Sequence, residues 1–261
     1  MDVPPGGLSV TVLGCSGTYA GPGGACSGYL VRAAGTNVVV DLGSGTLANL
    51  QRHVALADVD AVVLSHEHPD HWLDLPVLRN ALRYVLGLGD LPVYGTDGTR
   101  RLARAVMGEM APTLRWTTVD EASSVEIGPL RLRFSATDHS VETLAVRADG
   151  GGRSLLYSAD TGAGWDPGAA GAGVDTFLCE ASLPPDEEGT FQHLSARQAG
   201  ALATAIGAGR LVLTHLVPGA DAAAQRERAA TEFAGPVASA VDGTGPGGSG
   251  ATIDGADTIV V

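Results

Sequence analysis

The chain has 261 residues, of which 44% are hydrophobic, and it carries a formal net charge of −13 at pH 7. This length and composition predict a globular protein with a well-buried core. The sequence has no apolar run of about 18 residues and no basic-then-apolar leader after Met1, so it lacks the usual signs of a membrane span or a secretory signal. We therefore expect a cytoplasmic protein with no membrane partner.

The charge also bears on the substrate. All 16 basic residues are arginine, and 29 acidic residues outnumber them. Nucleic-acid affinity comes largely from the neutralisation of phosphates by Lys and Arg, so an acidic protein meets long-range repulsion when it approaches a polyanion. A large nucleic acid is disfavoured as a partner, and a small, compact substrate fits better.

The cysteines exclude two kinds of small fold. Cys15, Cys26 and Cys179 are odd in number and widely spaced, which neither a disulfide framework nor a cysteine-based zinc ribbon would produce. We expect reduced thiols in the core.

Short apolar runs, rich in Val and Leu, alternate along the chain with Gly-rich or amphipathic stretches. The runs predict strands over 9–13, 28–32, 37–42, 59–64, 130–136, 144–147, 154–158, 176–179 and 210–214. The amphipathic stretches predict helices over 46–53, 75–86, 99–110, 195–206 and 220–233. Clusters of strands interleaved with helices indicate the α/β class, with two sheets and the helices outside them.

No shift in composition marks an internal linker, so we predict a single domain over residues 1–261. The Gly-rich stretch 242–255 precedes residues 257–261, which we predict to be a closing strand. The strand-rich order of each half also allows a two-fold pseudo-repeat.

Histidines follow the strand that ends at Leu64. His66, His68, Asp70 and His71 lie within six residues, and Pro69 stiffens the turn between them. In such a turn the imidazoles at 66 and 68 can converge on one ion, while Asp70 and His71 point to a second. Imidazole and carboxylate suit borderline divalent cations, Zn²⁺ first.

Three more potential ligands trail apolar strands in the same way. They are His139 after 130–136, Asp160 after 154–158 and His215 after 210–214. Residues at strand ends emerge into loops held by a rigid sheet, where α/β proteins place their reactive groups. The sequence therefore predicts a metal site at these strand ends. The alternative for Asp160 is a turn residue before Thr161.

With these motifs the chain resembles the metallo-β-lactamase-fold hydrolases over nearly its whole length. Within them it is most similar to the ribonuclease Z-like phosphodiesterase branch, which includes enzymes that cleave cyclic nucleotides. The motifs are Leu13-Gly14-Cys15-Ser16-Gly17-Thr18, the H-x-H-x-D-H segment, Asp160-Thr161-Gly162, Glu180-Ala181-Ser182, His193-Leu194-Ser195 and Leu213-Thr214-His215. The resemblance implies a four-layer αββα sandwich.

The resemblance also implies a ligand set for two divalent ions. One ion would be held by His66, His68 and His139, and the other by Asp70, His71 and His215. Asp160 would bridge them, because its two oxygens can span ions that lie roughly 3.5–4 Å apart. Zn²⁺, Mn²⁺ and Fe²⁺ all accept such ligands.

The same relatives imply a proton relay of Asp70, Glu180 and His193 that protonates the leaving oxygen. The alternative for His193 is a place in the N-cap region of the helix at Ser195. Asp41 either orients a ligand imidazole or caps a turn, and His53 is expected at the surface. The loop 14–28 either brings backbone N–H groups to a phosphate or needs glycine only for tight turns.

These residues together predict a binuclear metal-dependent phosphodiesterase of small diesters. A hydroxide that bridges the two ions would attack phosphorus, and His193 would protonate the departing oxygen. The favoured substrates are 3′,5′-cyclic nucleotides, which would yield nucleoside 5′-monophosphates.

Three other functions remain open. Ribonuclease Z-like RNA 3′ processing is disfavoured because His139 and Asp160 are only 21 positions apart, which leaves no room for the long arm of the tRNA-processing enzymes. A carbonyl-ester, lactone or thioester hydrolase would use the same hydroxide but would not need His193. A non-catalytic metal- or nucleotide-binding module should lack a ligand, and none is missing. A homodimer is compatible with the resemblance.

Overall fold

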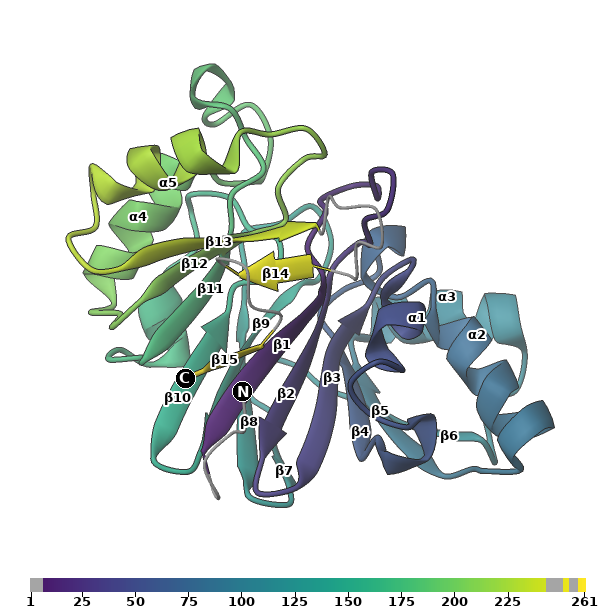
Figure 1. The fold of residues 1–261 in the computed structure, drawn as a ribbon. Coiled ribbons are helices and arrows are strands. Elements are labelled where there is room, and N and C mark those ends of the chain that lie inside the picture. Colours follow the sequence, from purple (N-terminus) through teal and green to yellow (C-terminus); the bar gives the residue numbers. More distant parts are fainter. Residues whose placement is uncertain (1–6, 243–250, 254–257) are drawn as a thin grey trace.

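Two β-sheets form the centre of the protein (Figure 1). The computed structural model describes residues 7–242, 251–253 and 258–261. The first sheet has seven strands in the order β15-β1-β2-β3-β4-β5-β6. Their bounds are β1 Leu8–Gly14, β2 Gly28–Ala33, β3 Thr36–Leu42, β4 Ala61–Leu64, β5 Leu91–Gly95, β6 Leu114–Thr118 and β15 Thr258–Val260.

The second sheet has eight strands in the order β14-β13-β12-β11-β10-β9-β8-β7. Their bounds are β7 Ser124–Ile127, β8 Leu130–Ala136, β9 Leu144–Gly150, β10 Arg153–Tyr157, β11 Thr176–Glu180, β12 Leu211–Thr214, β13 Val237–Asp242 and β14 Ala251–Ile253. In chain order, each sheet first forms antiparallel pairs, from β1 to β3 and from β7 to β10. Parallel pairs follow, from β3 to β6 and from β10 to β13. The late strands β14 and β15 pair antiparallel with β13 and β1. The strand order therefore has the pseudo-repeat that the sequence allowed.

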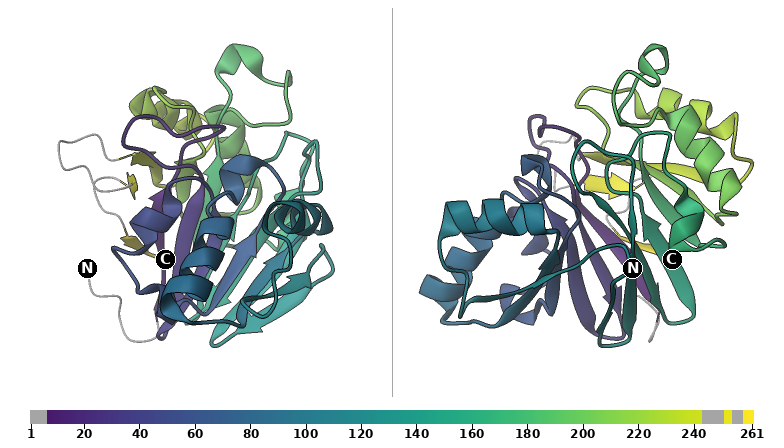
Figure 2. Two further views of the ribbon diagram at one scale, coloured as in Figure 1. Left: turned by 90° about the vertical axis from the view of Figure 1, so that its right-hand side faces the viewer. Right: turned by 180° about the vertical axis from the view of Figure 1, so that it is seen from behind.

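Helices cover the outer face of each sheet (Figure 2). The first sheet carries α1 Thr46–Leu50, α2 Leu75–Asn80, which continues as the π-helix η3 Ala81–Leu86, and α3 Asp97–Met107, while the second carries α4 Ala196–Ala205 and α5 Ala222–Ala230. The 3-10 turns are η1 Leu56–Asp58, η2 Pro69–His71, η4 Pro167–Ala170 and η5 Pro185–Glu187.

Three apolar layers hold these parts together. One lies between the sheets, where Val10 and Val40 of the first sheet share a cluster with Leu132 and Leu178 of the second. A second layer joins the first sheet to its helices, and a third joins the second sheet to α4 and α5. Helix, sheet, sheet and helix are thus stacked as the predicted αββα sandwich.

The predicted elements form with small shifts at their ends, and five strands are additional. The strands β5, β6, β7, β13 and β14 were not predicted, because they are short and most of them mix polar residues, proline or glycine with the apolar ones. The predicted helix 46–53 ends early, since α1 stops at Leu50 and turns follow.

The C-terminal expectation holds where the structure describes it. The closing strand is β15, which pairs antiparallel with β1 through Ser9 and Val260. Within the Gly-rich stretch, 251–253 form β14, whereas 243–250 and 254–255 lie outside the described residues.

All three cysteines are buried thiols, as expected. Among the described helices, none combines the length and the apolar character that a membrane span requires.

Candidate metal centre

The predicted ligands meet at one edge of the sandwich because of how the strands run. In the second sheet β9 is antiparallel to both β8 and β10, and β10, β11 and β12 are parallel, so β8, β10, β11 and β12 all end at the same edge. His139, Asp160 and His215 follow three of these ends. The loop after β4 and the turn η2 bring the H-x-H-x-D-H segment to the same place.

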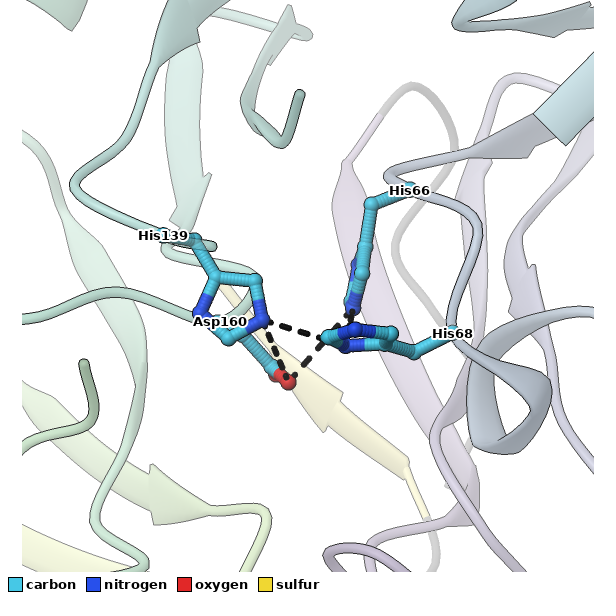
Figure 3. Close-up of side chains that lie close together, drawn as sticks. All are labelled: His66, His68, His139 and Asp160. Carbon is cyan, nitrogen blue, oxygen red and sulfur yellow. Dashed lines mark hydrogen bonds and ion pairs between the residues drawn. The ribbon is translucent and has the colours of Figure 1, made fainter. Parts of the chain in front are cut away.

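We call His66, His68 and His139 the first ligand group (Figure 3). Nδ1 of His68 lies 3.1 Å from Nε2 of His66 and 3.1 Å from Nε2 of His139. Oδ2 of Asp160 lies 3.5 Å and 3.8 Å from the same two Nε2 atoms. Three ring nitrogens and one carboxylate oxygen therefore converge on a single point.

The second ligand group consists of Asp70, His71 and His215. Nε2 of His215 lies 3.2 Å from Oδ2 of Asp70 and 3.3 Å from Nε2 of His71. Oδ1 of Asp160 lies 3.3 Å from Nε2 of His71 and 3.4 Å from Nε2 of His215. Asp160 thus directs one oxygen to each group, as a bridging carboxylate must.

Asp160 carries the clearest sign that a cation fits here. Its Oδ1 atom is buried and accepts no hydrogen bond from the described residues. A buried carboxylate oxygen without a donor is rare and costly, and a bound cation would satisfy it. The donor set of imidazole nitrogens and carboxylate oxygens is compatible with divalent metal binding.

Two oxygen acceptors fix the tautomers of one histidine in each group. His71 places Nδ1 2.8 Å from Oδ2 of Asp41, and His139 places Nδ1 3.0 Å from the carbonyl oxygen of Gln192. A carboxylate and a carbonyl only accept hydrogen bonds, so both Nδ1 atoms carry the proton. Nε2 is therefore the nitrogen of each ring that faces the centre, and it can bind a metal once the ring is neutral.

Two serines fix the other pair of tautomers. Ser65 donates its hydroxyl to Asp41 (2.8 Å), so its oxygen is left to accept from Nδ1 of His66 at 2.9 Å. Ser182 donates to Oε2 of Glu180 (2.8 Å) and in the same way can accept from Nδ1 of His215 at 2.8 Å. The outward nitrogens of His66 and His215 hold the protons, and their inward nitrogens are free to bind.

Asp41 does more than orient His71. Its carboxylate also accepts from the backbone N–H of Ser65 (2.8 Å) and from the hydroxyl of Tyr157 (2.9 Å). Tyr157 belongs to the second sheet and Asp41 to the first, so this bond crosses the core. A second cross-sheet bond joins Tyr29 and Thr214 at 2.6 Å. Of the two roles considered for Asp41, the geometry favours the imidazole acceptor.

The charges of the centre favour a cation. Burial raises the pKa of Asp160, but the charges of His215, His71 and His66 outweigh it and hold the pKa well below its usual value. Burial, together with repulsion from His71, lowers the pKa of His66 to about 4. At neutral pH the carboxylate of Asp160 is therefore ionised and the ring of His66 is neutral, and both are the forms that bind a metal. Burial lowers the pKa of His71 and of His215, but the charge of Asp160 outweighs it and raises both pKa values, so a metal that binds there would displace protons from these rings.

Glu180 and His193 form a pair beside the two groups. Glu180, the last residue of β11, is fully buried, and its Oε1 accepts from Nδ1 of His193 at 2.8 Å. Backbone N–H groups of Thr161 and Leu194 and both donors of Ser182 also point at this carboxylate. Five hydrogen bonds compensate the burial of the charge.

Glu180 sets the protonation of His193. Burial lowers the pKa of His193, but the hydrogen bond to Glu180 and the charges of Glu180, Asp160 and Asp70 outweigh it and raise the pKa to about 9. The ring is then protonated at neutral pH and has a second N–H, on Nε2, to donate. A ring nitrogen of His193 lies within 4.8 Å of ligand atoms of Asp160 and His215.

Among the described residues, Asp70, the third member of the predicted relay, has no hydrogen bond to Glu180 or His193. Asp70 contacts His215 and reaches His193 through its charge. The N-cap interpretation of this region also holds, because Ser195 caps α4 with a capping box while His193, two residues earlier, bonds Glu180. His53 is half-buried and stands outside both ligand groups.

The glycine-rich loop after β1 supports the second ligand group. Thr18 donates its backbone N–H to Oδ2 of Asp70 at 2.8 Å, from a left-handed conformation with φ 65°. A Cβ atom on Gly17 would lie 2.6 Å from the carbonyl oxygen of His215, so only glycine fits there. Glycine here allows the loop to pack on a ligand residue.

Two pockets open beside the centre, one toward each ligand group. The first pocket, about 510 Å³, is lined by His68, His139 and the glycines 162 and 164. The second pocket, about 790 Å³, is lined by residues 217–221 and by Thr18 and Ser182, which contact Asp70 and His215 of the second ligand group. His193 and Phe191 line both pockets, so they stand between them.

Sequence reasoning missed the hydroxyl partners of the ligands. Ser65, Tyr157 and Ser182 hold the ligand network; Ser182 stood within a motif of the resemblance, but no hydroxyl of the three was predicted to support a ligand. The available signal was their position, since each lies at a strand end or directly beside a predicted functional residue.

Known proteins match the chain over most of its length. A family model described as a beta-lactamase superfamily domain matches residues 36–216. The uncharacterized protein Rv1339 of Mycobacterium tuberculosis is 38% identical over 250 residues and the match covers 88% of each chain. Ribonuclease Z of Mycobacterium avium is 32% identical over 265 residues, which cover 88% of this chain and 94% of that one.

A solved structure agrees with these matches. The crystal structure of the metallo-β-lactamase fold protein YhfI from Bacillus subtilis superposes with a TM-score of 0.83 at 30% identity, over 90% of this chain and 96% of that chain. The family model spans both ligand groups and Asp160. Since the family model matches more than half of the chain and relatives at 30% identity or more cover most of it, the chain belongs to the metallo-β-lactamase superfamily of metal-dependent hydrolases.

Proposed function

We propose that the protein is a binuclear phosphodiesterase that acts on small phosphodiesters, with 3′,5′-cyclic nucleotides as the favoured substrates. The observation that carries this proposal is the buried Glu180 bonded to His193 beside both ligand groups. A phosphodiester with an alkoxide leaving group needs a proton donor, whereas a carbonyl hydrolase can stabilise its oxyanion on metal alone.

Seven residues of the chain would hold the two metal ions. One divalent ion would be held by His66, His68 and His139. The other would be held by Asp70, His71 and His215. Asp160 would contact both ions. Zn²⁺ suits these donors best, and Mn²⁺ or Fe²⁺ is compatible with them. The bound ions would supply the activated water and neutralise the phosphate charge.

His193 would donate the proton that the departing oxygen needs. Glu180 accepts from Nδ1 and so leaves the Nε2 proton for the substrate, while its charge keeps the ring protonated. For a 3′,5′-cyclic nucleotide the departing atom is the 3′ oxygen, and the product is a nucleoside 5′-monophosphate. Asp70 would assist through its charge.

The short hairpin between His139 and Asp160 argues against the rival RNA 3′-processing function. The interval between His139 and Asp160 is filled by the hairpin of β9 and β10, which turns at Gly151 and Gly152 with positive φ at both. That hairpin carries no protruding arm.

A cytoplasmic location and a homodimer stay predictions from the sequence.

Purified protein, loaded with Zn²⁺ or Mn²⁺, should be assayed against 3′,5′-cAMP, 2′,3′-cyclic nucleotides and bis(p-nitrophenyl) phosphate. We expect turnover of these diesters, with 3′,5′-cAMP among the best, and little cleavage of a pre-tRNA. A lactone, a thioester and a β-lactam serve as carbonyl substrates for comparison. Turnover of carbonyl substrates without any phosphodiester would overturn the proposal.

A further inference from the structure

Phe191 is the exception among the phenylalanines. The chain has four, and Phe134, Phe177 and Phe233 are 5%, 0% and 6% exposed, whereas Phe191 is 65% exposed. A single exposed apolar side chain is common on protein surfaces and means little alone. The position of Phe191 is what gives it meaning, because it stands at the mouth of the metal centre.

The residues on both sides of Phe191 are fixed. Gln192 accepts from His139 through its carbonyl (3.0 Å) and donates its side-chain amide to Asp138 (3.1 Å). His193 is bonded to Glu180, and Thr190 donates its N–H and its hydroxyl to the carbonyl of Glu187 (3.0 and 2.7 Å). The loop after β11, which rises above α4 and α5 in Figure 1, thus carries Phe191 on anchored backbone.

The second pocket offers a partner surface for this ring. Its walls include Phe191, Leu183, Pro184, Val217 and Pro218, and Val217 is 37% exposed. The rest of the lining is largely polar or charged and includes Glu187, Asp221, Gln225 and Arg228. A pocket of about 790 Å³ whose walls are part apolar and part polar can hold a small molecule that has an apolar face and polar edge groups.

This pocket is continuous with the centre. Ser182, which contacts His215, and Thr18, which contacts Asp70, both line it, and so does His193. A diester phosphate at the ligand groups therefore places the rest of its molecule within reach of Phe191. The substrate part that fits there must be flat, largely apolar on its faces and polar at its edge.

We propose that the second pocket receives the nucleobase of the substrate and that the ring of Phe191 stacks on it. This proposal rests on the proposed function and adds to it the place where the base of a cyclic nucleotide binds. Every base has an aromatic face, so stacking tolerates all of them. The enzyme should accept adenine and guanine nucleotides alike and bind pyrimidine nucleotides more weakly.

The test replaces Phe191 by Ala, Leu and Tyr and compares two substrates of the metal-loaded protein. One is 3′,5′-cAMP, and the other is methyl ribofuranoside 3′,5′-cyclic phosphate, which has no base. For Phe191→Ala we expect kcat/KM on cAMP to fall about 5- to 100-fold, mainly through KM, because base stacking on an aromatic side chain contributes that much. The base-lacking substrate should lose far less.

The other variants separate stacking from simple contact. Phe191→Tyr should restore the KM for cAMP, and Phe191→Leu, which keeps an apolar side chain of similar size, should not. An unchanged KM for cAMP in Phe191→Ala, or an equal loss on both substrates, would overturn the proposal.

Equilibrium binding keeps this test separate from the proposed function. Titration of the wild type with AMP and with ribose 5-phosphate should show tighter binding of AMP, and Phe191→Ala should remove the difference. If the wild type hydrolyses no phosphodiester, the proposed function fails. The base pocket fails independently if AMP and ribose 5-phosphate bind alike.

Discussion

The two ligand groups differ in how the protein holds them. The second group, Asp70, His71 and His215, is buried, and each member has a partner behind it, namely Thr18, Asp41 and Ser182. In the first group only His66 is fully buried, and His139 is held by the backbone carbonyl of Gln192 on an exposed loop.

This difference has a consequence for metal exchange. The first group faces the 510 Å³ pocket through His68 and His139, so its ion should exchange faster with solvent. None of the second group's ligands lines the 790 Å³ pocket, and each has a hydrogen-bond partner before any ion binds; such preorganisation favours affinity. We therefore expect two unequal sites, a tighter one at the second group and a more labile one at the first.

Asp160 joins the two sites, and its removal should have the largest effect. In Asp160→Ala both groups lose an oxygen ligand, so we expect at most one ion per chain and a loss of activity beyond the roughly 10–100-fold that outer partners of ligands give. Metal analysis by mass spectrometry and steady-state kinetics measure the two effects. Glu67→Ala is the matched control, since Glu67 lies in the same histidine-rich segment but in neither group. Two tightly bound ions in Asp160→Ala would contradict the bridging role.

His193 stands between the two pockets, and its removal should divide substrates by their leaving group. His193→Ala should lower kcat on 3′,5′-cAMP by about 10²–10⁴-fold and affect bis(p-nitrophenyl) phosphate much less, because p-nitrophenolate leaves without a proton. His53→Ala serves as the control. Equal losses on both substrates would remove His193 from the role of acid.

The pH dependence of the wild type should carry the same signature. The proton donor is the charged form of His193, which exists below its pKa of about 9, so activity on cAMP should fall as the pH rises past that value. Bound cations lower this pKa, so the alkaline limb lies at or below about pH 9. The limb should be absent in His193→Ala.

Asp41→Asn should separate the two sites by affinity. Asparagine tolerates the left-handed conformation of residue 41, where φ is 56°, but its amide cannot replace both acceptor oxygens behind His71 and Ser65. We expect the second site to lose about 10–100-fold in metal affinity and the first site to lose less, because Asp41 reaches His66 only through the hydroxyl of Ser65. Competition with a chelator measures both affinities. Asp74→Asn is the control, because Asp74 accepts from a backbone N–H away from the histidines. Equal weakening of both sites would show that Asp41 acts on the fold as a whole.

Ser182→Ala should give the smallest of these effects. Its hydroxyl links Glu180 to His215, and the loss of one such hydrogen bond is worth about fivefold in rate or affinity. Ser182→Thr keeps the hydroxyl and should restore the activity. NMR of the metal-free protein can follow the Nδ1–H signal of His215, which should shift in Ser182→Ala and recover in Ser182→Thr. No change in either measurement would remove Ser182 from the network.

The sequence was sufficient to predict the donor residues but not the structure that holds them. His66, Asp160 and His215 stood out because each trails an apolar strand, and the strands place them at one edge. Ser65 and Tyr157 could not be singled out, since their roles depend on how the two sheets face each other. The strand β7 was also missed. Its residues alternate between exposed and half-buried and none is fully buried, so the sequence shows no apolar run there.

Each ligand group contains residues from both sheets. His66 and His68 come from the first sheet and His139 from the second, and His71 and His215 are divided in the same way. Every bound ion would therefore cross-link two layers that also meet through apolar contacts and through cross-sheet hydrogen bonds such as those of Tyr157 and Tyr29. Heat resistance and metal supply are thus coupled, since a ligand that binds only the folded chain raises its unfolding temperature by mass action.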